Sequence, residues 1–350
     1  MFGVQFANVL ANGATLAMAL AILFAPCASR AGAVNMTWVD VGNPNNAADL
    51  SGHGRVDHAY RIGMYEVTIG QYADFLNAAA KSDPYGLYDD HMRTDLNIAG
   101  ISRAGTSGSY TYTVIDSANR PIAYVSWFDA ARFANWMQNG QGSGSTETGA
   151  YTLNGLTSGS APAKNAGAQV YIPTVDEWYK AAFYSPAKGI AGGYYSFATQ
   201  SDSAPGNTIG ATADQANYYA GGHYATTNAG ETYSTSQNYL TNVGAFSASA
   251  SYYGTFDQDG NVQEWNDDFY SGLSRGVGVR GGFWNSQNPS SLDKATGAAL
   301  ANAADANSGY GFRLASVVAV PEPSTGCLLA AGIAAGWRAI RRRCSAHATR

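Results

Sequence analysis

Apolar residues recur at helical spacing in three segments, each of which follows a Ser or Thr suited to a helix N-cap. After Thr68, apolar residues at 72, 75, 76 and 79 share one face of a helix. Gln71 supplies the third-position partner of a capping box. Ser126 begins the second segment, and Thr174 with Glu177 begins the third. We therefore expect three capped helices, the first and third fed by strand-like runs at 60–67 and 170–173.

Two long stretches, 139–167 and 189–236, show neither helical nor strand periodicity. They are rich in Gly, Ser, Thr, Asn and Tyr, which is typical of surface loops. Structureless loops of this length usually carry a function or are held by a bound ion. The pattern predicts a body with little regular secondary structure.

Composition narrows the class of protein. The chain has 350 residues, a formal charge of −5, only 13% charged residues and 41 glycines. A mild acidic balance without a basic block in the body gives no surface for nucleic acid, so we expect no nucleic-acid partner. The three cysteines are Cys27, Cys327 and Cys344. Because residues 28–326 contain none, the body has no internal disulfide, thiolate metal site or cysteine nucleophile.

The N-terminus is typical of a secretory signal peptide. An apolar run at 14–25 precedes Ala31-Gly32-Ala33, small residues that suit a cleavage site. This run is short for a membrane span. We assign residues 1–33 to the signal peptide, with an uncleaved anchor as the alternative.

The C-terminus combines a Pro-Glu-Pro motif at 321–323, an apolar run at 326–337 and an arginine cluster at 341–343. This order resembles the PEP-CTERM sorting signal of Gram-negative bacteria. The resemblance implies processing by an exosortase and an exported location, at the cell envelope, outer surface or extracellular matrix. Residues 320–350 would then be the sorting signal and the only part that enters a membrane, and a plain membrane anchor is the alternative.

Six motifs follow one another in the body, residues 34–319. They are Tyr65-Glu66-Val67-Thr68, Val125-Ser126-Trp127, Ile172-Pro173-Thr174, Gly260-Asn261-Val262-Gln263-Glu264-Trp265, Arg280-Gly281-Gly282-Phe283-Trp284 and Gly309-Tyr310-Gly311-Phe312-Arg313. Their order resembles the formylglycine-generating enzyme, or sulfatase-modifying factor, family over about 36–316. The resemblance implies an α+β fold related to C-type lectins, with long loops and calcium bound in them.

The oxidase chemistry of that family depends on two cysteines, a copper ion and oxygen. Here the cysteine positions are Ser286 and Ser291, and a hydroxyl does not replace a thiolate as a Cu(I) ligand. Phe283 and Gln263 also depart from the family pattern. We therefore expect neither copper nor formylglycine generation. Serine hydrolysis is not expected either, because neither serine lies in a nucleophile elbow and no histidine lies in a partner motif.

Calcium is the cofactor that the residues favour. The run from Asp257 to Glu264 concentrates oxygen ligands, although it is not an EF-hand. By resemblance, the ligands would be the side chains of Asp257 and Glu264 and the carbonyl oxygens of Gly260 and Val262. A second family site would use Asn217 and the carbonyl oxygen of Tyr218. The alternative is an acidic turn that binds no ion.

The sequence thus predicts a calcium-stabilised, non-catalytic binding domain. Arg280 and Arg313 are interpreted as structural groups, each able to satisfy several buried acceptors. We expect a saccharide or peptide ligand at 285–308, helped by the tyrosines at 218–219 and 252–253. The rival hypotheses are an oxidase with an altered metal site and a structural matrix protein.

Overall fold

The computed structural model describes residues 33–189, 192–228, 231–270 and 276–318. The chain divides into two compact units, residues 1–33 and 34–350, and the helices and strands of the described residues belong to the second. Apart from Ala33, the predicted signal peptide and the sorting tail lie outside the described residues. Within the described ranges, no helix combines the length and the apolar character needed to cross a membrane.

The three predicted helices are confirmed. They are α1 (Ile69–Ala79), α3 (Trp127–Gln138) and α4 (Val175–Phe183). Each begins with a complete capping box; at α1 the Gln71 N–H donates to Thr68 Oγ1 at 3.3 Å and the Thr68 N–H donates to Gln71 Oε1 at 2.9 Å. These reciprocal bonds satisfy the N–H groups that a helix start leaves unpaired. A short helix α2 (His91–Thr94) and a 3₁₀ turn η1 (Pro289–Ser291) were not predicted.

Two four-stranded sheets organise the body. The first has the order β1-β2-β12-β5, formed by Trp38–Val41, Tyr60–Gly63, Ala315–Val317 and Val170–Tyr171, all antiparallel. The second has the order β10-β9-β8-β11, formed by Ala298–Ala301, Gly276–Arg280, Gln263–Tyr270 and Tyr310–Gly311, with β11 parallel to β8. Two hairpins complete the strands, β3 (Ile101–Ala104) with β4 (Thr111–Val114) and β6 (Tyr184–Ser185) with β7 (Gly193–Tyr194). The first sheet therefore joins segments from the beginning and the end of the body.

The main core lies between α1, α3 and the sheets. Aromatic rings make up its centre: Phe133 of α3 lies 5.3 Å from Phe75 and 5.4 Å from Phe312, centroid to centroid, in edge-on geometry. Each of these side chains is fully buried. Such edge-on pairs add to the apolar burial that stabilises the fold.

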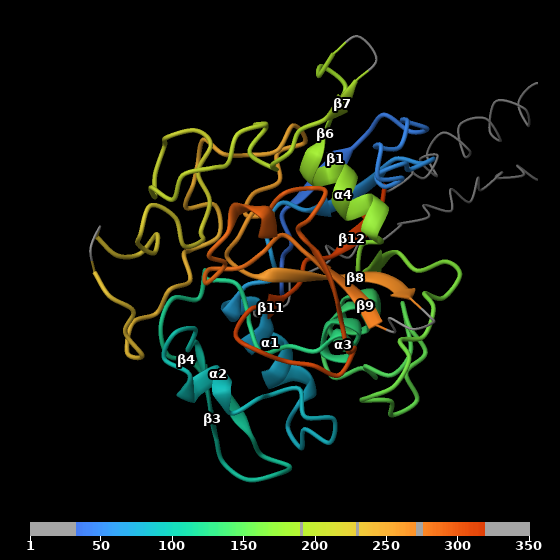
Figure 1. The fold of residues 1–350 in the computed structure, drawn as a ribbon. Helices are drawn as coiled ribbons and strands as arrows, with labels where there is room; N and C mark the ends of the chain where they lie inside the picture. The colour runs from blue at the N-terminus through green and yellow to red at the C-terminus, as the bar shows by residue number, and fades with distance from the viewer. Residues whose placement is uncertain (1–32, 190–191, 229–230, 271–275, 319–350) are drawn as a thin grey trace, which may run out of the picture. The chain divides into compact units, whose positions relative to one another are not determined.

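Strand β8 separates this core from helix α4, as Figure 1 shows. Side chains alternate along a strand, so Trp265 faces the α3 side, where its Nε1 donates to the Val125 carbonyl at 2.9 Å. Its neighbour Glu264 faces α4, where it accepts from Trp178 Nε1 at 2.8 Å. The alternation places a charged group in the interior on the α4 side of the sheet.

The long loops are held by side-chain amides. Asn135 Nδ2 donates to the carbonyls of Thr146 and Tyr151 at 2.6 and 3.0 Å, and this fastens the loop at 139–167 to α3. Asn207 Nδ2 donates to three carbonyls of residues 218–223, the best at 2.9 Å. Buried asparagines thus supply part of the constraint that a bound ion was expected to provide.

Candidate functional site

Glu264 and Arg313 form a fully buried ion pair below α4. Both side chains are 0% exposed, and the guanidinium donates from Nε to Oε2 and from Nη2 to Oε1, each at 2.6 Å. Arg313 also donates to the carbonyls of Gly63 at 3.0 Å and Phe256 at 2.8 Å. The structure confirms that Arg313 is a structural group, and it shows that both oxygens of Glu264 have a partner.

Two more carboxyl groups surround this pair. Glu66 is 1% exposed, and neither of its oxygens has a hydrogen-bond partner in the described structure. Burial first, and then the charge of Asp257, raise the pKa of Glu66 well above its usual range. Asp257 Oδ2 accepts the N–H of Gly244 at 2.5 Å. Burial raises the pKa of Asp257 to about 6, against the lowering effect of Gly244 and Arg313.

This cluster has the charge, but only part of the ligand set, that a calcium ion needs. When ionised, Glu66, Asp257 and Glu264 carry three negative charges against the single positive charge of Arg313. A proton or a cation balances such an excess in the interior. Among the described residues, no group of three or more His, Cys, Asp or Glu is arranged to hold a metal ion. The calcium assignment, with Asp257 and Glu264 as carboxylate ligands, stays a prediction. Because Arg313 and Trp178 already bond to the oxygens of Glu264, Asp257 is the predicted carboxylate ligand that lies outside the ion pair.

The two predicted calcium segments meet at one point of the backbone. Gly260 forms a parallel bridge with Asn217, and the N–H of Asn261 donates to the Asn217 carbonyl at 2.8 Å. A Cβ on Gly260 would lie 2.1 Å from that carbonyl oxygen, and Gly260 has φ +88°. Only glycine fits there. Asn217 itself donates to the Tyr239 carbonyl and to Asn261 Oδ1, at 3.0 and 2.9 Å.

The cysteine-equivalent serines lie around Gly282. A Cβ on Gly282, whose φ is +67°, would lie 3.2 Å from Ser286 Oγ and 3.1 Å from the Ser291 carbonyl oxygen. Ser286 is 5% exposed, and its Oγ accepts the N–H of Phe283 at 3.0 Å. Ser286 therefore stabilises a turn. Among the described residues, no histidine forms a hydrogen bond with its hydroxyl.

An aromatic stack lies beside this turn. The sequence predicted its neighbours, Tyr219 and residues 285–308, as parts of a binding surface, but not the stack itself. The rings of Tyr233, Tyr239 and Trp284 lie nearly parallel in a column, with centroid distances of 5.7 Å and 5.0 Å between successive rings. Tyr224 packs against Tyr239 at 4.2 Å and donates through its hydroxyl to Asn285 Oδ1 at 3.0 Å. Tyr233 is 50% exposed, so the column reaches the surface. We call Tyr224, Tyr233, Tyr239 and Trp284 the aromatic column.

The tyrosines of the two predicted pairs, 218–219 and 252–253, lie in different environments. Tyr218 is 3% exposed and its hydroxyl donates to the Pro205 carbonyl, whereas its neighbour Tyr219 lies 4.9 Å from Tyr224 of the column. Tyr253 donates to Asn43 Oδ1 at 3.0 Å, in a different part of the body, and Tyr252 is 44% exposed there. Tyr218 and Tyr219 therefore both lie beside the predicted recognition segment: Tyr218 packs with the buried Leu292, and the Tyr219 N–H donates to the Ser286 carbonyl at 3.1 Å.

That segment, 285–308, does not form a single surface. Its ends lie at the aromatic column, where Trp284 Nε1 donates to the Ser308 carbonyl at 3.1 Å. Its middle runs elsewhere: the Lys294 N–H donates to the Ser196 carbonyl at 2.9 Å, and β10 pairs with β9. Arg280, predicted to be structural, lies with its guanidinium 5.1 Å from the Tyr179 ring.

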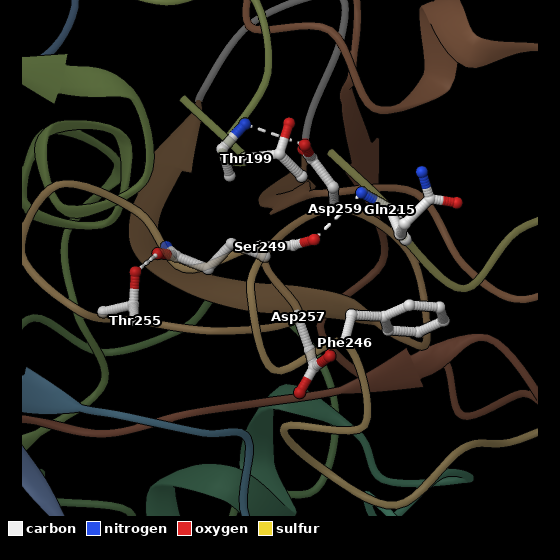
Figure 2. Close-up of a pocket in the computed structure, with 10 residues that line it drawn as sticks. Thr199, Gln215, Phe246, Ser249, Thr255, Asp257 and Asp259 are labelled. Atoms are coloured by element: carbon white, nitrogen blue, oxygen red, sulfur yellow. Dashed lines mark hydrogen bonds between the residues drawn. The ribbon is translucent and has the colours of Figure 1, made fainter. Parts of the chain in front are cut away.

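A small polar cavity lies against the start of the Asp257–Glu264 loop, and Asp257 and Asp259 are among the residues that line it, as Figure 2 shows. Its lining includes Thr199, Gln215, Ser249 and Asp259. Asp259 is 3% exposed, and its Oδ2 accepts the N–H of Ala198 at 2.7 Å. In the sequence Asp259 is one of several residues of this loop that carry side-chain oxygens. The signal that would have distinguished it, its burial, depends on packing against residues 198–199.

Comparisons with known proteins agree on the fold. The family model described as a sulfatase-modifying factor enzyme 1-like domain matches residues 29–318, and that of the PEP-CTERM protein-sorting motif matches residues 319–343. The crystal structure of CarF has a TM-score of 0.51 at 20% identity, over 82% of this chain and all of CarF. Variable protein 1 of Treponema denticola has a TM-score of 0.50 at 18% identity, over 82% of this chain and 97% of that one. A comparison with curated proteins returned no match.

Proposed function

Because this chain belongs to the sulfatase-modifying factor enzyme 1-like family and carries a PEP-CTERM sorting motif for export, we propose that it is a surface-exposed binding domain without oxidase activity. The observation that carries the proposal is the aromatic column, which opens to the surface beside the turn that replaces the oxidase cysteines. The α+β, C-type-lectin-like fold supplies a rigid support for such a site.

The turn at Ser286 supports a binding role over an oxidative one. The family's oxidase needs a thiolate pair, and the chain has no cysteine between residues 28 and 326. The hydroxyl of Ser286 is engaged with a backbone N–H, which suits a structural turn. Bound copper or iron in the purified protein would favour the rival hypothesis, an oxidase with an altered metal site.

The ligand class that the column favours is a saccharide. Tyr233 offers a flat apolar ring at the surface, and polar amides flank it: Asn97 Oδ1 accepts the Tyr233 hydroxyl, and Asn285 Oδ1 accepts the Tyr224 hydroxyl. Sites of this kind combine aromatic area with a few polar groups that fix orientation. A pyranose ring has an apolar face and a polar rim, which match such a surface.

A binding assay on immobilised polysaccharides tests this function, with the exported full-length protein in solution. Tyr233→Ala removes the exposed ring of the column and should weaken binding at least about tenfold, the effect of losing roughly 1.4 kcal/mol. Tyr252→Ala removes a tyrosine of similar exposure elsewhere, 44% against 50%, and should bind like the unmodified protein. Binding to peptides alone, or equal binding by both variants, would contradict the saccharide assignment.

Calcium at the Asp257–Glu264 loop is part of the same proposal. The Asp257 carboxylate and the carbonyl oxygens of Gly260 and Val262 would supply ligands, with Glu264 contributing charge while it holds Arg313. The ion would neutralise the excess negative charge of the cluster and so stabilise the folded state. Chelator should lower the melting temperature, and Asp257→Asn should reproduce most of that loss, whereas the exposed control Asp305→Asn should not. Equal melting in calcium and in chelator would mean that protons balance the cluster.

The location we propose is the envelope or extracellular matrix of a Gram-negative bacterium. The sorting motif at 319–343 supports handling by exosortase-type machinery. Deleting residues 320–350 should move the protein between cell fractions. An unchanged distribution would show that the tail does not direct sorting.

A further inference from the structure

Tyr124 has an unfavourable backbone conformation. Its φ is +58°, whereas every other described residue with positive φ is Gly, Asn, Asp or Gln. A tyrosine is strained in this region, because its Cβ crowds the backbone. Its half-buried ring packs against the cluster that contains Tyr239 and Trp284 of the aromatic column. Strain of this kind persists where the surrounding structure holds it, and it concentrates at binding sites, so a binding role is a reason for a tyrosine to stand here.

The ring of Tyr124 holds His91 of helix α2 in place. The two rings lie 4.9 Å apart, centroid to centroid, with 16° between their planes. His91 Nδ1 also donates to Asp89 Oδ1 at 2.7 Å. The His91 side chain is nevertheless 61% exposed. A ligand that binds a mobile side chain must first order it, and a ring that is already held by two contacts avoids this entropic cost.

Asp95 joins this pair of rings to the outer ring of the aromatic column. Its Oδ2 accepts the Tyr124 hydroxyl at 2.8 Å, and its Oδ1 accepts the Asn97 N–H at 3.1 Å. The side-chain oxygen of Asn97 in turn accepts the Tyr233 hydroxyl. Burial first, and then the charge of Asp95, raise the pKa of Tyr233. The His91–Tyr124 pair and the column are therefore two flat surfaces at the ends of one short hydrogen-bonded chain.

The carboxylate between the two surfaces determines which ligands fit. A carboxylate has about four lone-pair positions, so Asp95 can accept further hydrogen bonds beside the two that it already accepts. None of the ion pairs among the described residues includes Asp95. Hydroxyl and amino groups of a sugar can donate to it, whereas the carboxylate of a uronic acid would be repelled.

We propose that the His91–Tyr124 pair is a second sugar subsite, and that the whole site takes an oligosaccharide of at least two units without acidic groups. One unit lies on the ring of Tyr233, and the next lies on the exposed ring of His91. Asp95 accepts hydrogen bonds from hydroxyl or amino groups between them. This inference rests on the saccharide binding proposed above and adds the length and the charge class of the ligand.

Competition by fragments of the polysaccharide that the full-length protein binds tests the subsite. The probes are its monosaccharide, disaccharide and tetrasaccharide. The disaccharide should compete at least about tenfold better than the monosaccharide. His91→Ala should remove this gain and leave the affinity for the monosaccharide unchanged, whereas His91→Phe keeps a flat ring and should retain most of the gain. Tyr252→Ala, which removes an exposed ring elsewhere, should behave like the unmodified protein.

The outcomes separate the subsite from the function on which it rests. A disaccharide that competes no better than the monosaccharide, or a gain that survives His91→Ala, would overturn the subsite and leave the column as a binding site. The comparison of fragment lengths uses the unmodified protein, so it decides the question even if a variant does not fold. If no polysaccharide and no fragment binds, the proposed function fails, and the subsite fails with it.

The same tetrasaccharide, oxidised at its primary alcohols to uronic acids, tests the charge class. The unmodified protein should bind the oxidised form at least about tenfold more weakly than the original. Asp95→Asn should reduce this difference, because it removes the negative charge between the two surfaces. Asp40→Asn, at an exposed position of strand β1, should preserve it. Equal binding of both forms by the unmodified protein would contradict the role proposed for Asp95.

Discussion

Replacing Glu264 by Gln removes a charge from the interior while it keeps the side-chain volume. In the unmodified protein both groups of the Glu264–Arg313 pair are 0% exposed, and two bonds of 2.6 Å join them. The amide of Gln accepts with its oxygen and has no lone pair on its nitrogen. Arg313 would therefore keep its carbonyl partners Gly63 and Phe256 but lose its counter-charge.

The expected cost is about 3 kcal/mol. Breaking a buried pair from one side typically costs about 3–5 kcal/mol, because the remaining charge stays buried. The lower end applies here, since Arg313 keeps its bonds to the carbonyls of Gly63, Met64 and Phe256. This is a large share of a typical stability of about 5–15 kcal/mol. Because the ion pair sets most of the cost, a destabilisation of this size should also be measured in chelator.

Urea unfolding, followed by tryptophan fluorescence, measures this cost. Glu231→Gln is the matched control, since Glu231 is an exposed residue and the same chemical change there should cost less than about 0.5 kcal/mol. A cost below about 1 kcal/mol for Glu264→Gln would refute the reasoning that the pair holds this region together.

Three further predictions concern the backbone, a histidine and the absent oxidase chemistry. Gly260→Ala should prevent folding or lower the free energy of unfolding in urea by more than about 4 kcal/mol, because its Cβ would lie 2.1 Å from the Asn217 carbonyl oxygen. The control Gly222→Ala, at φ +82° with no atom within 4 Å of the added Cβ, should cost only about 1–2 kcal/mol. The hydrogen bond to Glu177 raises the pKa of His58 above 6.5, so its contribution is complete below the unfolded pKa of about 6.5 and is lost as pH rises through the higher folded value. His58→Gln should therefore destabilise more at about pH 5.5 than at about pH 8.5, and an equal effect at both would show that the His58 charge does not matter. Mass spectrometry should find no aldehyde on a cysteine-containing sulfatase peptide, even with copper, and turnover above a metal-only blank would restore the oxidase hypothesis.

Local signals in the sequence predicted the helices well. Thr68 with Gln71, and Thr174 with Glu177, are contacts between residues three apart, so the sequence contains all that the capping boxes need. The structural interpretation of Arg313 was also confirmed. Its partner was not predicted, because Glu264 lies 49 positions away and the same residue type serves equally as a calcium ligand.

The candidate site depends on packing between segments that are distant in the sequence, which no local pattern predicts. Tyr224 and Tyr233 come from the loop at 189–236, which shows no periodicity, and Tyr239 follows it. The chain turns back there, so that the Ser234 N–H donates to the Tyr239 hydroxyl at 2.7 Å and the rings pack together. The recognition segment was predicted as a continuous stretch, whereas the structure uses its two ends. Asp259 was one of several acidic residues in the sequence, and only the approach of residues 198–199 distinguishes it.

The fluorescence of Trp284 during a polysaccharide titration tests the proposed function most directly. Trp284 is 3% exposed and lies at the inner end of the column whose outer ring is Tyr233. We predict a saturable change in emission that Trp284→Phe removes and that Tyr233→Ala shifts to at least about tenfold higher ligand concentration. An emission that stays constant at saturating ligand, or a change that survives Trp284→Phe and Tyr233→Ala unaltered, would contradict a binding site at the aromatic column.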